Sequence, residues 1–173
     1  YYPCLCLAAS GLLYYSRMSE PDKNILLATD HAGFKLKNII QEMLENELGY
    51  AVEDVGAMEF DEKDDYPDFG SALATRVRET GWPGIAFCGS GIGICAVLNK
   101  YKGIVAGTGF NVQVAEAMKK DEDTNVLCLA GRMVGEDYAK AIVRKWLETP
   151  FSEEERHVRR LKKIKKIEGE NMV

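Results

Sequence analysis

The sequence predicts a single α/β domain built on a doubly wound parallel sheet, and three observations support this prediction. Short apolar segments alternate five times with longer segments of helical periodicity, which is the pattern of parallel strands joined by crossover helices. The apolar segment that ends at Cys88 passes through glycines at alternate positions into a helical segment. The 173 residues also suit one domain large enough to bury a substantial core.

Each element has its own local signal. Strands are expected at residues 24–29, 51–55, 84–88, 103–108 and 125–130. Helices are expected at residues 34–48, 69–80, 94–100, 111–120 and 136–147, followed by a charged C-terminal helix over 152–168. Gly49 stops the first helix. Ser152 and Glu155 have the spacing of a capping box at the start of the last one.

The expected strand order, 2-1-3-4-5, places a topological switch point between the first and third strands. In open α/β sheets, ligands bind at the carboxyl ends of the strands at such a point. Those two ends carry Asp30-His31 and Cys88-Gly89-Ser90. Two chemically rich turns that lie far apart in the sequence are therefore expected to meet in one crevice.

The first residues differ from the rest of the chain. The stretch 1–17 is apolar and begins without methionine, whereas Met18-Ser19-Glu20-Pro21 resembles a natural start. We interpret residues 1–23 as an extension outside the domain, from spurious upstream translation, a tag remnant or a degenerate signal peptide. The single domain is expected over 24–173, with the C-terminal helix included.

Composition excludes several classes of function. A net charge of −5 provides no general attraction to nucleic acid or to a membrane surface. Five cysteines without framework-like spacing indicate a reducing compartment, and we expect a cytoplasmic protein. The sequence has only two histidines and no C-x-x-C motif, so no structural metal site is expected. No metal or organic cofactor is expected.

Cys88 and the turn after it allow two interpretations. Gly89, Gly91 and Gly93 form G-x-G-x-G, which is not the dinucleotide-binding fingerprint. The thiol could be a small, inert core residue in a tight turn. Alternatively, the turn could direct backbone amides at an anion beside a catalytic thiolate. Such a site, with an Asp-His pair opposite, suits aldose–ketose isomerisation, because a base would sit near carbon and donors near the oxygen that becomes negative.

Three arginines suggest a phosphate group on the substrate. Arg132 follows the fifth strand and points toward the same edge of the sheet. Arg156 and Arg160 share one face of the C-terminal helix, and two guanidinium groups suit a phosphate. A charged helix face that merely contacts water, or a weak patch for polyanions over 162–166, is the competing interpretation.

The chain resembles the type B ribose-5-phosphate isomerases, the group that includes galactose-6-phosphate isomerase subunits. The resemblance covers about residues 24–168. It rests on these motifs in the order and spacing of the family: Asp30-His31-Ala32-Gly33-Phe34, Asp65-Tyr66-Pro67-Asp68, Cys88-Gly89-Ser90-Gly91-Ile92-Gly93, Asn99-Lys100, Asp123-Thr124-Asn125-Val126, Gly131-Arg132, and Arg156-His157 with Arg160.

The resemblance implies a Rossmann-like three-layer sandwich and a homodimer or homotetramer with shared active sites. It implies metal-independent conversion of ribose 5-phosphate to ribulose 5-phosphate in the pentose phosphate pathway. Cys88 would be the base, and the turn after it would form the anion hole. The implied catalytic residues are Cys88, Ser90 and Asp121. The implied substrate-binding residues are Asp30, His31, Tyr66, Gly89, Gly91, Gly93, Asn99, Arg132, Arg156 and Arg160.

Two departures from the family pattern leave room for another function. Asp121 and Glu122 stand where the family commonly has His-Asn, and that histidine assists opening of the sugar ring. A carboxylate is a poorer acid at neutral pH, so ring opening is expected to be slower. Val105 replaces a frequent arginine. The alternatives are an isomerase of galactose or allose 6-phosphate and a non-catalytic sugar-phosphate-binding protein.

Overall fold

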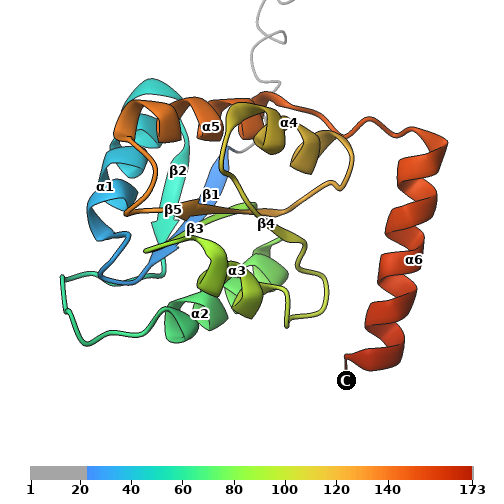
Figure 1. Cartoon of the computed structure of the whole chain (residues 1–173), viewed down its shortest axis with the longest axis horizontal. Coiled ribbons are helices and arrows are strands. Elements are labelled where there is room, and N and C mark those ends of the chain that lie inside the picture. Colours follow the sequence, from blue (N-terminus) through green and yellow to red (C-terminus); the bar gives the residue numbers. More distant parts are fainter. Residues whose placement is uncertain (1–22, 173) are drawn as a thin grey trace, which may run out of the picture.

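The computed structural model describes residues 23–172, in which a five-stranded parallel sheet lies between two layers of helices (Figure 1). The strands are β1 (Asn24–Thr29), β2 (Ala51–Asp54), β3 (Gly84–Cys88), β4 (Ala106–Thr108) and β5 (Val126–Ala130). The helices are α1 (Phe34–Glu42), η1 (Met43–Glu47, a π-helical continuation of α1), α2 (Tyr66–Thr80), α3 (Ile92–Leu98), α4 (Val112–Lys120), α5 (Glu136–Glu148) and α6 (Glu155–Asn171). The predicted fold class is confirmed.

Successive strand residues point to opposite faces of the sheet, so the domain has two hydrophobic cores. Ile25, Phe87 and Leu129 face the core under α1, α4 and α5. Leu26, Ala86 and Cys128 face the core over α2 and α3. Strands buried on both faces explain why these segments are continuous apolar runs in the sequence.

The strand order is β2-β1-β3-β5-β4, so the expected order 2-1-3-4-5 was wrong at one edge. The apolar β5 is fully buried and pairs with β3, with Phe87 opposite Leu129. The strand β4 is only Ala-Gly-Thr and is half-buried along its length, which suits an edge position. The neighbours β1 and β3, which define the switch point, are as expected.

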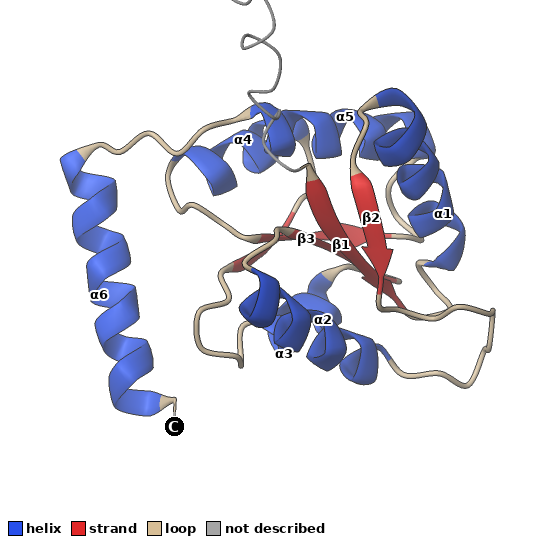
Figure 2. Cartoon of the chain, turned by 180° about the vertical axis from the view of Figure 1, so that it is seen from behind, coloured by secondary structure: helices blue, strands red, loops and turns tan. Residues whose placement is uncertain are grey.

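The C-terminal helix α6 begins at Glu155 and ends at Asn171, rather than spanning 152–168. Glu153 has a left-handed backbone (φ 54°), which keeps the chain out of the helix at that point. The hydroxyl of Ser152 lies 2.7 Å from Nδ1 of buried His157, so the expected capping box with Glu155 is wrong. The helix stands at one end of the molecule, outside both helical layers (Figure 2).

Of the extension 1–23, which was interpreted above as lying outside the domain, residues 1–22 are outside the described residues. Within residues 23–172, no helix is long and apolar enough to cross a membrane.

Candidate active site

A cleft of about 360 Å³ opens at the carboxyl ends of β1 and β3, where the two predicted turns meet. Four segments build it: the β1–α1 turn, the start of α2, the β3–α3 turn and the β5–α5 turn. The lining residues are Asp30, His31, Ala32, Tyr66, Cys88, Gly89, Ser90, Gly93, Arg132 and Met133. Most of the residues that the sequence nominated are therefore together.

Cys88 is the last residue of β3 and is 3% exposed at the floor of the cleft. The amide of Gly91 donates to its sulfur at 3.1 Å, and the amide of Ile92 donates to the hydroxyl of Ser90 at 3.3 Å. Gly91 has φ +73°, a conformation that favours glycine, and a Cβ there would come within 3.0 Å of the Leu129 backbone. These two amides of the expected anion nest are thus directed at side chains of the same turn, and they fix the thiol and the hydroxyl beside the cleft.

Asp30 supplies a carboxyl group next to this turn. It is 4% exposed and accepts hydrogen bonds from the amides of Ala32 (2.9 Å) and Gly33 (3.2 Å). Burial raises the pKa of Asp30, and the two amides oppose that shift. A carboxyl group with a raised pKa is better suited to exchanging protons with a sugar hydroxyl than an exposed one.

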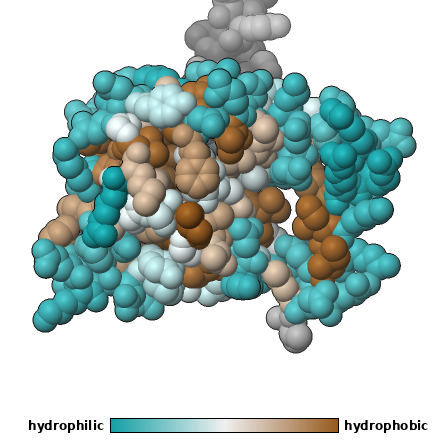
Figure 3. Space-filling model, in the orientation of Figure 1, coloured by the Kyte–Doolittle hydropathy of each residue, from teal (hydrophilic) through white to brown (hydrophobic). Residues whose placement is uncertain are grey.

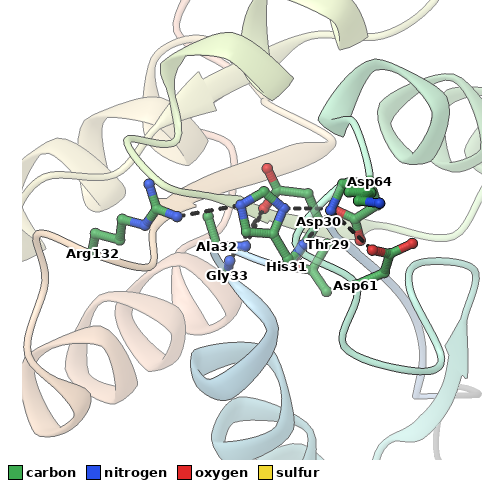
Figure 4. Close-up of polar contacts among 9 residues, drawn as sticks. Thr29, Asp30, His31, Ala32, Gly33, Asp61, Asp64 and Arg132 are labelled. Atoms are coloured by element: carbon green, nitrogen blue, oxygen red, sulfur yellow. Dashed lines mark hydrogen bonds and ion pairs between the residues drawn. The ribbon is translucent and has the colours of Figure 1, made fainter.

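His31 lies between Asp64 and Arg132 (Figure 4). One carboxylate oxygen of Asp64 contacts both the His31 amide (2.8 Å) and its Nδ1 (2.7 Å), and Nη2 of Arg132 lies 3.3 Å from Nε2. The hydrogen bond to Asp64 is the main reason why the pKa of His31 is raised. Asp64 was missed by sequence reasoning, because it is one of several acidic residues in the loop 59–68 and no pattern distinguishes it.

Asp30, His31 and Asp64 also bring three ligand-type atoms within 4.8 Å of one another. Their contacts are already used: Asp30 binds two backbone amides and Asp64 holds the imidazole. The positive Arg132 borders the same group. We therefore interpret these three side chains as a hydrogen-bonded array whose ligand-type atoms are already engaged, rather than as a metal site.

Tyr66 opens α2 and lies across the start of α3. A Cβ on Gly93 would come within 2.7 Å of Cζ of the Tyr66 ring, so the ring occupies the space left by a missing side chain. Pro67 in the first turn favours the helix start that presents Tyr66 to the cleft. Gly93 therefore has a steric role in shaping the cleft.

Five nominated residues do not line this cleft within the described chain. Gly91 is one of them, although its amide contacts Cys88. Asn99 binds the backbone of Ala106 through both ends of its amide, at 2.9 and 3.0 Å. Asp121 lies 3.7 Å from Nδ1 of His157. Arg156 pairs with Glu154 at 2.8 Å, and Arg160 is exposed on α6.

A thiol, a glycine turn and an arginine at the switch point of a doubly wound sheet form the framework of an α/β enzyme. The chain belongs to the Ribose/Galactose Isomerase family, whose model matches residues 25–164. The resemblance that the motifs indicated is thereby confirmed.

The chain matches individual relatives over nearly the whole of their length. The "Probable ribose-5-phosphate isomerase B" of Mycoplasma genitalium is 39% identical over 149 residues, which are 85% of this chain and 97% of that protein. A crystal structure of the Mycoplasma genitalium ribose-5-phosphate isomerase B with bound ribulose-5-phosphate has a TM-score of 0.81 at 38% identity, covering 86% of this chain and 97% of the other. The D-erythrulose-4-phosphate isomerase 2 of Mycolicibacterium smegmatis is 33% identical over 147 residues, 84% of this chain and 97% of that protein.

Proposed function

We propose that this protein interconverts ribose 5-phosphate and ribulose 5-phosphate through an enediolate, without a metal ion. The observation that carries the proposal is Cys88, whose sulfur lies in a cleft with an amide donor at 3.1 Å and a serine hydroxyl beside it. The Mycoplasma genitalium relative with bound ribulose-5-phosphate supports the substrate. The free thiols of Cys88, Cys95 and Cys128 suit the reducing cytoplasm.

The proposed reaction moves one proton between neighbouring carbons. The Cys88 thiolate removes the proton from C2 of the open-chain aldose, and the electron pair passes to the C1 oxygen. The Ser90 hydroxyl and the backbone amides of the β3–α3 turn other than those of Gly91 and Ile92 stabilise the negative oxygen. The Cys88 thiol then returns the proton to C1, while Asp30 exchanges a proton with the sugar oxygens. His31 and Arg132 hold the phosphate at the other end of the cleft.

Deuterium exchange tests this chemistry directly. Ribose 5-phosphate in D₂O is expected to gain deuterium at C2 as ribulose 5-phosphate forms, and Cys88→Ala is expected to lose both signals in NMR spectra. Cys95→Ala is the matched control, because Cys95 also lies in the β3–α3 segment but does not line the cleft. Exchange that persists in Cys88→Ala would refute the thiol mechanism.

Other sugar phosphates are the second candidate. The family's description includes galactose isomerases, and one relative is named for a four-carbon ketose phosphate. Asp121 is consistent with a substrate that needs little help in ring opening, since a carboxylate is a poor acid at neutral pH. Values of kcat/KM for ribose 5-phosphate, galactose 6-phosphate, allose 6-phosphate and erythrose 4-phosphate, measured together, would rank them. Absence of proton exchange with all four would favour a non-catalytic sugar-phosphate-binding protein.

We further propose a homodimer in which α6 of one copy completes the cleft of the other. Arg156 and Arg160 do not line the cleft of their own chain. Ile164 and Ile167 of α6 are 38% and 58% exposed, and apolar surface is visible on the side of the helix facing the body (Figure 3). Exposed apolar surface of this kind suits a covering partner.

Mixing two inactive variants tests the shared site. Cys88→Ala lacks the base, whereas the double variant Arg156→Ala/Arg160→Ala lacks the two arginines that α6 would add to the phosphate site of the other copy. Random re-pairing of the two would make about half of the dimers mixed, with one intact site each, so about a quarter of wild-type activity should return. A mixture that stays inactive while light scattering shows exchanged dimers would refute the sharing of sites.

A further inference from the structure

The contacts of Asp64 determine which nitrogen of His31 carries the proton. A guanidinium group only donates hydrogen bonds, so the 3.3 Å contact of Nη2 of Arg132 with Nε2 is a hydrogen bond when Nε2 carries no proton. The proton then resides on Nδ1 and is donated to Asp64 at 2.7 Å. In this arrangement the Nδ1 edge of His31 faces Asp64 and the Nε2 edge faces Arg132.

The charges around His31 are mainly negative, with one arginine opposing them. Asp64 and Glu62 come from the loop before α2, and Asp30 comes from the end of β1, all with negative charge. Arg132 from the β5–α5 turn opposes a second proton on the ring. The ring of Phe60 packs edge-on against the imidazole at 6.2 Å. Asp64 and Asp30 raise the pKa of His31, so both carboxylates favour the protonated ring.

We propose that Asp64 is a positioning residue that makes His31 a proton-coupled receptor for the dianionic phosphoryl group of the substrate. When the dianion binds between Arg132 and His31, it takes over the Arg132 hydrogen bonds, and Nε2 takes up a proton from water. The imidazolium then donates one hydrogen bond to the phosphoryl oxygen and the other to Asp64. The pair of side chains thus adds a positive charge only when the anion is present.

This proposal rests on the proposed sugar-phosphate binding, but its test does not require turnover. Inorganic sulfate is the probe, because it remains a dianion across the pH range in which histidine titrates. The chain has two histidines, so the imidazole signals of His31 can be assigned in ¹H–¹⁵N NMR spectra with a His31→Gln variant. Calorimetry in buffers of different ionisation enthalpy counts the protons taken up.

In the wild-type protein, sulfate should raise the pKa of His31 by about one unit or more, because a new opposite charge contacts the ring. Proton uptake should accompany binding above the pKa of the free protein. Asp64→Asn keeps an acceptor oxygen and removes the charge. It should lower the pKa of His31 and weaken sulfate binding by about tenfold at alkaline pH, whereas the two affinities should converge at acidic pH, where both rings are protonated.

Asp61→Asn is the matched control, since Asp61 lies in the same acidic loop but, among the described residues, its side chain accepts its hydrogen bond from the amide of Lys63 and not from His31. It should leave the titration of His31 unchanged. A loss of affinity in Asp64→Asn that is equal at every pH would reduce Asp64 to a loop anchor and overturn the proposal. Sulfate binding to wild-type protein without proton uptake, or no binding at all, would overturn it as well. A chain that titrates as described but does not isomerise ribose 5-phosphate would refute only the proposed function.

Discussion

Gly93→Ala should separate activity from stability. The added Cβ would lie 2.7 Å from Cζ and about 3 Å from both Cε atoms of the Tyr66 ring, where ordinary carbon contacts are about 3.5–4.0 Å. The ring must therefore move by roughly 1 Å. It can move outward, because Tyr66 is 37% exposed. If Tyr66, which lines the cleft, contacts the substrate as the family motif implies, a misplacement of this size costs up to about a hundredfold in rate. We therefore expect kcat/KM to fall about ten- to a hundredfold.

Stability should behave differently. Gly93 lies in α3 and has no positive φ, so alanine there should contribute up to about 1 kcal/mol through helix propensity. The outward shift of an exposed ring offsets part of that gain. The free energy of unfolding should therefore stay within about 1 kcal/mol of the wild type in urea titrations. Gly169→Ala is the control, because it adds a methyl group to helix α6 in open space.

A double-mutant cycle tests whether Gly93 acts through the Tyr66 ring. In a Tyr66→Ala background the clash no longer exists, so Gly93→Ala should cost little further activity. If kcat/KM falls by the same factor in both backgrounds, the glycine acts through something other than the ring. A loss of several kcal/mol in stability would also contradict the steric argument.

Three further predictions concern the cleft and its supports. Asp30→Asn keeps an acceptor for the two backbone amides but removes a buried charge. Because burial raises the pKa of Asp30 above its ordinary 3.8, the stability of the wild type should decline as pH rises from that value through the folded pKa. Urea titrations should therefore show that the variant is at least as stable as the wild type at pH 7. Its kcat/KM should be greatly reduced. Gly33→Ala places a Cβ 2.5 Å from Cβ of Phe87 and should cost about 2 kcal/mol or more, seen as a lower Tm; an unchanged Tm would show that the β1–α1 turn can relax. The pKa of Cys95 is lowered to about 6, mainly by a hydrogen bond from the Cys128 thiol. The rate of alkylation of Cys95 by iodoacetamide, followed by peptide mass spectrometry, should therefore show an inflection near that pH. An inflection above about 8, the range of an ordinary thiol, would contradict the hydrogen bond.

The outcome for β4 and β5 shows why the strand order was partly missed. Both segments were recognised as strands, but the expected order followed the chain and placed β4 next to β3, with β5 at the edge of the sheet. Burial decides otherwise: β5 is apolar at all five positions and fully buried, whereas β4 is three residues long and only half-buried. A strand that must be covered on both faces belongs inside the sheet.

The residues of the cleft divide in the same way. The places of Cys88 and Asp30 in the cleft were predictable, because each follows a strand at the switch point and the motif around each is local. Asp64 was not, since its pairing with His31 spans 33 residues and depends on the path of the intervening loop. The contact of Asp121 with His157 likewise depends on how α6 leaves the domain.

By itself, the sequence determined the alternation of strands and helices, the glycine turn after Cys88 and the family motifs. These are local properties, set by side-chain periodicity and by backbone conformations that glycine and proline favour. Only the tertiary structure decided the edge strand, the Asp64–His31–Arg132 array and the placement of α6 away from its own cleft. Those features depend on which distant segments cover each other, and burial and charge balance are properties of the assembled chain.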